Sequence, residues 1–170
     1  MPSKSKTKGA SGERELCGIL SEIFGGSFVR VPSSGAQVGG TNAHRLEKYS
    51  DTQGRAFRGD VIPPDNLPNL YIETKSYKAF LFHQLLQPAG CSILNTWIKQ
   101  AYEGKIATDL LFICYKISRI GWYVAMPEDA CHGYVFDNYC TYLSPSGRMR
   151  VTDMLSFFKT NYQLISKRAA

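Results

Sequence analysis

Apolar residues recur along this chain at the spacing of amphipathic helices in several places. The first series begins after Ser11, a residue type that favours the N-cap of a helix, and stops at the glycine pair 25–26. Comparable series cover residues 91–106 and 152–162. We therefore predict three amphipathic helices, together with a short apolar helix at 80–86.

Other apolar stretches have the length and composition of strands. Residues 110–115 and 121–126 are nearly continuous apolar runs, which are typical of strands inside a sheet. The stretches 61–62 and 70–76 are rich in β-favouring residues, and the Pro/Asn-rich segment between them predicts an antiparallel hairpin. With a first strand at 27–31, the order of elements predicts an α/β fold in which helices flank a central mixed β-sheet.

Length and composition predict one domain, residues 1–170. The chain is 44% hydrophobic and 20% charged, and no apolar run approaches the length of a membrane span, so we expect no membrane partner. The Lys-rich segment 1–10 has no apolar core behind it, which predicts a flexible basic tail rather than a secretory signal. We expect a cytoplasmic protein that meets the nucleoid or viral DNA in the host cell. Five scattered cysteines without a Cys-x-x-Cys spacing suggest neither a disulfide framework nor a zinc site.

The charge balance favours a polyanionic partner. The net charge is +6 and the pI is about 9.1. Basic residues and glycines fill the long segment 36–57, and loops of this length tend to be functional or disordered. Both readings of this insertion stay open. In the functional reading, the residues that contact nucleic acid are Arg45, Lys48 and Arg55, with Arg58 just beyond the segment and Lys78 after the predicted hairpin.

Two carboxylates and a lysine meet at one edge of the predicted hairpin. Side chains two residues apart share a face of a strand, so Tyr71, Glu73 and Lys75 point the same way, and strand pairing brings Asp60 beside Glu73. Adjacent carboxylates repel each other, and Mg²⁺, or Mn²⁺ in its place, relieves this repulsion while accepting phosphate oxygens as further ligands. We predict a metal-dependent phosphodiester-hydrolysing site in which the two acids bind the cation and Lys75 orients water or neutralises charge. The alternative is an ordinary surface Glu/Lys pair.

An acid, a turn and Glu-x-Lys in this order resembles the signature of the PD-(D/E)xK nucleases, which have a restriction-endonuclease-like core. Further motifs are similar to those of archaeal-type Holliday-junction resolvases. These motifs are Lys8-Gly9 with Glu13-Arg14-Glu15-Leu16, Phe28-Val29-Arg30 with Ser34-Gly35, Asp60-Val61-Ile62, Ile72-Glu73-Thr74-Lys75, and the stretch 111–124. The similarity extends over most of the chain, in the form of short separate motifs.

The resemblance implies an endodeoxyribonuclease that resolves four-way DNA junctions by paired nicks, as a homodimer with two sites. It adds Glu13 to the metal-binding acids, although the position of Glu13 alone favours a solvated residue near a helix start. It also makes Arg30 and Ser34 candidates for phosphate contact. The segments 36–57 and 80–97 depart from the family pattern, the first where it bears on substrate choice and the second where it bears on the dimer surface. The alternatives are another PD-(D/E)xK nuclease, of restriction, repair or RNA-processing type, and an inactive nucleic-acid-binding module.

Overall fold

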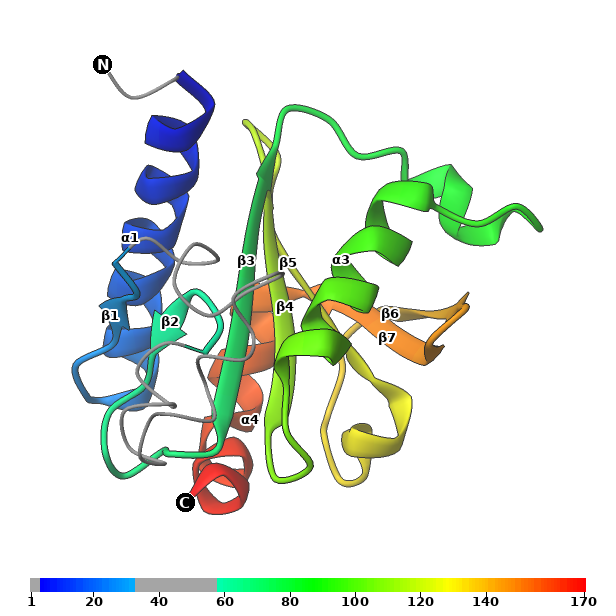
Figure 1. The fold of residues 1–170 in the computed structure, drawn as a ribbon. Coiled ribbons are helices and arrows are strands. Elements are labelled where there is room, and N and C mark those ends of the chain that lie inside the picture. Colours follow the sequence, from blue (N-terminus) through cyan, green and yellow to red (C-terminus); the bar gives the residue numbers. More distant parts are fainter. Residues whose placement is uncertain (1–3, 33–57) are drawn as a thin grey trace.

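Helices cover both faces of a five-stranded mixed sheet in the computed structural model, which describes residues 4–32 and 58–170 (Figure 1). Helices α1 (Lys4–Phe24) and α4 (Met154–Ala169) pack on one face, and α3 (Ser92–Gly104) packs on the other. The predicted α/β class, with a mixed sheet between helices, is confirmed.

The strand order in the sheet is β3-β4-β5-β7-β6. The first pair is parallel, and the other neighbouring pairs are antiparallel. A parallel pair needs a long crossover, which here contains α3 and the short 3₁₀ helix η2 (Phe82–Leu86). The strands span Leu70–Tyr77 (β3), Leu110–Ile117 (β4), Gly121–Pro127 (β5), Tyr139–Ser144 (β6) and Gly147–Asp153 (β7), and a second 3₁₀ helix, η3, spans Glu128–Cys131.

Alternate residues of the interior strands point into two separate cores. On β4, Phe112 and Cys114 belong to the core beneath α1 and α4, while Ile113 and Tyr115 belong to the core beneath α3. All four side chains are fully buried. Because both faces of β4 are covered from Leu111 to Tyr115, this part of the strand has no position for a solvated side chain, and this explains its continuous apolar sequence.

The first helix is longer than predicted. It begins at Lys4 and not at Ser11, so residues 4–10 are helical where a flexible tail was predicted. The helix continues through Gly12 because this face packs against β3: a Cβ at Gly12 would lie in ordinary contact with Ser76 Cβ, at 3.5 Å. Packing of a helix face contributes more to helix stability than local propensity does.

The predicted hairpin between residues 61–62 and 70–76 is wrong in its pairing. Strand β2 (Val61–Ile62) pairs antiparallel with β1 (Val29–Arg30) and forms a separate two-stranded sheet. A single backbone hydrogen bond, from Asp60 N to Ile72 O at 3.0 Å, still joins the start of β2 to β3. This bond places the start of β2 beside β3, although β2 does not join the five-stranded sheet.

The C-terminal third contains a strand that the apolar runs did not predict, β7, whose inward residues Met149 and Val151 alternate with arginines. Helix α4 follows it directly, with Asp153 as N-cap accepting a hydrogen bond from Ser156 N at 2.8 Å, and continues past Tyr162 to Ala169. No helix in the described part of the chain has both the length and the apolar character needed to cross a bilayer. The predicted long loop 36–57 lies outside the described residues.

Candidate active site

Strand β3 presents three polar side chains on one face at the edge of the sheet. The Tyr71 hydroxyl donates a hydrogen bond to Glu73 Oε1 at 2.9 Å, and Lys75 Nζ donates to Glu73 Oε2 at 2.9 Å. Both oxygens of the Glu73 carboxylate are therefore held by residues of the same strand. The predicted alternation of this strand is confirmed, because all three side chains meet.

Asp60 reaches the same place from the start of β2. Its Oδ2 accepts a hydrogen bond from Thr74 N at 2.7 Å and lies 3.9 Å from Lys75 Nζ. The preceding residue must be glycine, because Gly59 has φ +68° and a Cβ there would lie 2.8 Å from Ile72 O. The predicted convergence of Asp60, Glu73 and Lys75 is thus present, although the strands do not pair as a hairpin.

The cluster contains more negative charge than one lysine balances. Burial, together with the neighbouring charge of Asp60, raises the pKa of Glu73 above its ordinary value. Burial opposes the charged form of Lys75, but the charges of Glu73 and Asp60 outweigh it and raise the pKa of Lys75. One lysine therefore faces two carboxyl groups, and the pair can accept further positive charge.

Glu13 and Arg30 bring two further elements to this edge. Arg30 Nε donates a hydrogen bond to Glu13 Oε2, which ties β1 to α1. The Glu13 side chain is only 12% exposed, so it is not the solvated residue that its position alone favoured. Its charge also contributes to the raised pKa of Lys75. In the β1–β2 ladder, the backbone of Arg30 lies opposite Val61, the residue after Asp60. Glu13, Arg30 and the start of β2 at Asp60, which belong to three of the motifs behind the resolvase resemblance, therefore lie close together.

The other predicted DNA contacts divide into three groups. Arg58 Nη1 lies 3.0 Å from Asp109 Oδ2, and its side chain is only 10% exposed, which leaves little of it for a phosphate. Lys78 is exposed just past the end of β3. The remaining four predicted contacts lie outside the described residues: Ser34, Arg45, Lys48 and Arg55.

The donor set at this site suits a hard divalent cation. Mg²⁺ is commonly held by one or two carboxylates together with substrate phosphate oxygens, and Asp60 and Glu73 provide two repelling carboxylates. Within residues 4–32 and 58–170, no three acidic, histidine or cysteine side chains form a group able to hold a metal ion. Glu13 is engaged by Arg30, and its place among the metal ligands stays a prediction.

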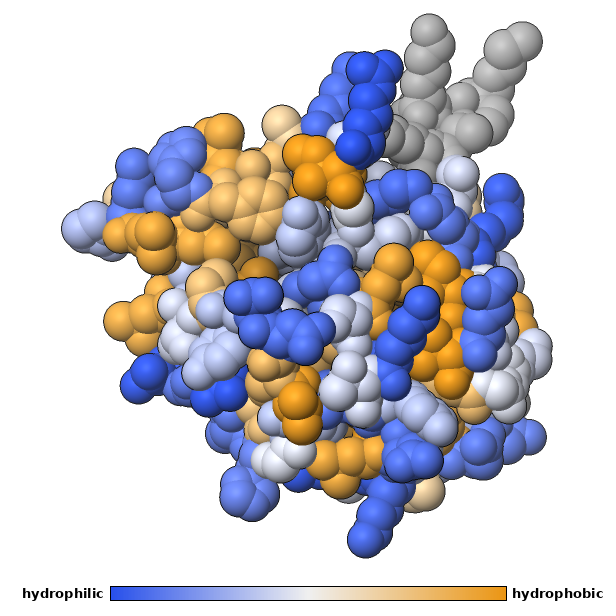
Figure 2. Space-filling model, turned by 180° about the vertical axis from the view of Figure 1, so that it is seen from behind, coloured by the Kyte–Doolittle hydropathy of each residue, from blue (hydrophilic) through white to orange (hydrophobic). Residues whose placement is uncertain are grey.

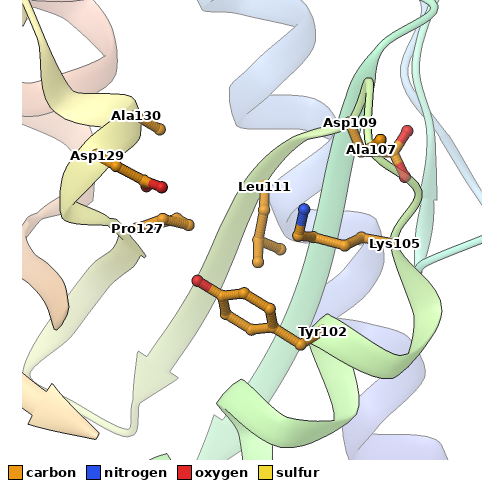
Figure 3. A pocket seen from close by; sticks show the side chains of 8 residues that line it. All are labelled: Tyr102, Lys105, Ala107, Asp109, Leu111, Pro127, Asp129 and Ala130. Atoms are coloured by element: carbon orange, nitrogen blue, oxygen red, sulfur yellow. The ribbon is translucent and has the colours of Figure 1, made fainter. Parts of the chain in front are cut away.

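A cavity of about 290 Å³ lies elsewhere, between the end of α3 and η3 (Figure 3). It is lined by Tyr102, Lys105, Ala107, Asp109, Leu111, Pro127, Asp129 and Ala130. The lining includes none of the candidate site residues Glu13, Asp60, Glu73 and Lys75, so the cavity is not the reaction site.

Sequence reasoning missed two residues that contact the candidate site residues. Tyr71 was placed on the correct face, but its hydrogen bond to Glu73 was not foreseen. Asp109 precedes an apolar strand and gives no sequence signal of the ion pair that it forms with Arg58.

Comparison with protein-family models gives a match that covers residues 4–161 and therefore nearly the whole chain. Comparison with curated proteins and with solved structures gives no match. The matched span includes Glu13, Asp60, Glu73 and Lys75, and the mixed sheet between helices is consistent with the restriction-endonuclease-like core of PD-(D/E)xK nucleases. The chain belongs to the family described as "Phage putative PDDEXK endonuclease" and is a nuclease of the PD-(D/E)xK type.

Proposed function

We propose that this protein is a Mg²⁺-dependent DNA endonuclease that resolves four-way junctions by paired nicks. One observation carries the enzymatic part of the proposal: Asp60 and Glu73 lie around Lys75 Nζ, at 3.9 Å and 2.9 Å, at the edge strand of the sheet. A pure DNA-binding surface gains nothing from two carboxylates that face phosphates, so this arrangement favours catalysis over simple binding.

The residues of the site have separate roles in this proposal. A bound Mg²⁺ supplies a polarised phosphorus centre and a water of lowered pKa. Asp60 and Glu73 hold the cation, and the Tyr71 and Thr74 hydrogen bonds keep the two carboxylates in place. Lys75 Nζ lies 2.9 Å from Glu73 and 3.9 Å from Asp60, where its positive charge is placed to stabilise negative charge that develops on the reacting phosphate.

The proposed selectivity for four-way junctions rests on the resolvase-like motifs and on the symmetry of the substrate. The resolvase-like motifs around Glu13 and Arg30 form a direct ion pair next to the Asp60 strand, as expected if they serve one site. One chain has one such set of residues, and a junction needs two nicks on strands of like polarity. A twofold homodimer presents two copies of the site to a substrate that is itself approximately twofold symmetric.

A cleavage assay with matched substrates tests both parts. With Mg²⁺ present, we expect the protein to nick a four-way junction in pairs and to cut a linear duplex and an RNA duplex of the same sequence far more slowly. Glu73→Gln serves as the inactive control. Equal cleavage of junction and linear duplex, or a monomer by sedimentation at micromolar concentration, refutes junction resolution and leaves the nuclease. Preferential cleavage of RNA assigns the site to RNA processing.

A further inference from the structure

We propose that the α3–β4 turn, residues 104–109, positions both catalytic carboxylates of the site. The turn acts on the site through two contacts, one with Tyr71, which binds Glu73, and one with Arg58, which lies two residues before Asp60. Its residues touch neither the reacting atoms nor the lysine, so their role is positioning and not catalysis. This inference rests on the proposed function, because it takes Glu73 and Asp60 as the acids of the reaction.

The first contact acts through Tyr71. Its hydroxyl donates a hydrogen bond to Glu73 Oε1 at 2.9 Å. The same hydroxyl packs against Gly104, the last residue of α3. A Cβ added at Gly104 would lie 2.2 Å from the hydroxyl oxygen and 3.3 Å from Tyr71 Cζ. The Tyr71 ring is 4% exposed and has little room to move aside. The absence of a side chain at Gly104 therefore leaves the space that lets Tyr71 orient the Glu73 carboxylate.

The second contact acts through Arg58. Asp109 Oδ2 lies 3.0 Å from Arg58 Nη1 and also accepts a hydrogen bond from Ile106 N at 2.7 Å, so the carboxylate binds its own turn and the arginine together. The pair is nearly buried, with side-chain exposures of 10% for Arg58 and 2% for Asp109.

Only Gly59 separates Arg58 from Asp60, and the Asp60 backbone is itself fixed by its hydrogen bond to Ile72 O. The short segment that carries the Asp60 carboxylate is thus held at both ends. This assigns Arg58 to positioning, in place of the DNA contact predicted from the sequence.

The opposite side of the turn is not closely packed. Lys105, Ala107 and Asp109 line the cavity of about 290 Å³ that opens toward η3 (Figure 3). The turn is therefore not held by dense packing all round, and its contacts with Tyr71 and Arg58 fix its distance from the site. A change in either contact is expected to reach the carboxylates, because Tyr71 and Arg58 link the turn to Glu73 and to the Asp60 segment.

A double-mutant cycle at Tyr71 and Gly104 tests the first contact. Tyr71→Phe removes a hydrogen bond to a charged group, and Gly104→Ala forces the hydroxyl away from Glu73. We expect each change to lower kcat, and the affinity for Mn²⁺ measured by calorimetry without DNA, by roughly tenfold to a hundredfold while KM for DNA is unchanged. The double variant lacks the Tyr71 hydroxyl that the new methyl group would contact. Its losses of kcat and of Mn²⁺ affinity should therefore equal those of Tyr71→Phe alone. Losses that multiply overturn the proposal.

Asp109→Asn tests the second contact, with Glu103→Gln as its control. Glu103 lies near the end of the same helix in an exposed pair with Lys99, so its neutralisation changes net charge equally without touching the site. We expect Asp109→Asn and Arg58→Lys to lower kcat and Mn²⁺ affinity about tenfold, with KM and its salt dependence unchanged, and Glu103→Gln to leave all of them unchanged. A changed KM and salt dependence for Arg58→Lys, with kcat intact, makes Arg58 a DNA contact and refutes positioning.

The two proposals fail in different ways. If the wild-type protein does not cleave DNA, the proposed function is wrong, and the Mn²⁺ affinities of the variants still decide whether the turn positions the carboxylates. If the wild-type protein cleaves and Glu73→Gln does not, but Tyr71→Phe and Asp109→Asn match the Glu103→Gln control, the turn has no positioning role. Thermal unfolding of each variant identifies any that does not fold; if Gly104→Ala is one of them, Tyr71→Phe and Asp109→Asn carry the test.

Discussion

The Asp60→Asn variant removes the negative charge of one candidate metal ligand and keeps the shape of its side chain. The asparagine side chain keeps an oxygen that can accept the Thr74 N–H, which Asp60 Oδ2 binds at 2.7 Å. The change removes the attraction to Lys75 at 3.9 Å and also the repulsion that raises the pKa of Glu73. Because these two effects oppose each other, we expect the free energy of unfolding without metal to change by no more than about 1 kcal/mol.

The effect of Mg²⁺ on the two proteins should differ strongly. A ligand at a hundred times its Kd stabilises the folded state by about 2.7 kcal/mol. For a chain of 170 residues this corresponds to a rise in Tm of about 5–11 °C. Asp60→Asn should lose most of this rise, since a site with one carboxylate binds the cation more weakly. Cleavage should fall about a thousandfold or more, because about 4 kcal/mol of transition-state stabilisation depends on the bound cation.

Thermal unfolding with and without Mg²⁺, followed by cleavage of a labelled junction, measures both effects. Asp65→Asn is the matched control, since Asp65 is an exposed acid in the connection between β2 and β3. It should respond to Mg²⁺ and cleave as the wild-type protein does. If Asp60→Asn keeps the full Mg²⁺-dependent rise in Tm, and cleaves within about tenfold of wild type, the assignment of Asp60 as a metal ligand is wrong.

The remaining predictions concern the lysine, a structural ion pair and the undescribed segment. Lys75→Gln should abolish cleavage but leave DNA binding, measured by fluorescence anisotropy, nearly unchanged; retained turnover contradicts its proposed role. Burial disfavours the charged form of Glu15, but hydrogen bonds from Lys116 and Trp122 outweigh it and lower the pKa of Glu15 below 4.5. Its stabilising effect should therefore be complete above about pH 5 and be lost as the pH falls through the folded-state pKa, so the Tm difference between wild type and Glu15→Gln should shrink in acid. DNA affinity should fall steeply with salt, and a triple alanine variant should show a shallower slope. The residues replaced in it are Arg45, Lys48 and Arg55.

The catalytic pattern on β3 could be predicted from the sequence because it is local. A strand alternates its side chains with a period of two, so Glu73 and Lys75 share a face whatever the rest of the chain does. The interior strand β4 was equally clear, since a short apolar run such as Leu111 to Tyr115 is typical of a strand covered on both faces. Strand β7 also carries a local signal, the alternation of Met149 and Val151 with arginines, but this alternation is not a continuous apolar run.

The long-range contacts of the site could not be predicted from such patterns. Whether β2 pairs with β1 or with β3 depends on the path of the whole chain, and local propensity wrongly favoured the nearer partner. The ion pairs of Glu13 with Arg30 and of Arg58 with Asp109 join residues far apart in sequence, and no periodicity marks them.

By itself, the sequence determined which side chains share a face of β3 and of the predicted helices, and with them the placement of Glu73 beside Lys75. Only the tertiary structure decided that α1 continues through weak helix formers to Lys4, that Arg58 is buried against Asp109, and that Gly104 makes room for the Tyr71 hydroxyl. The physical reason is that alternation follows from backbone geometry within a few residues, whereas burial and charge pairing depend on which distant segments pack together.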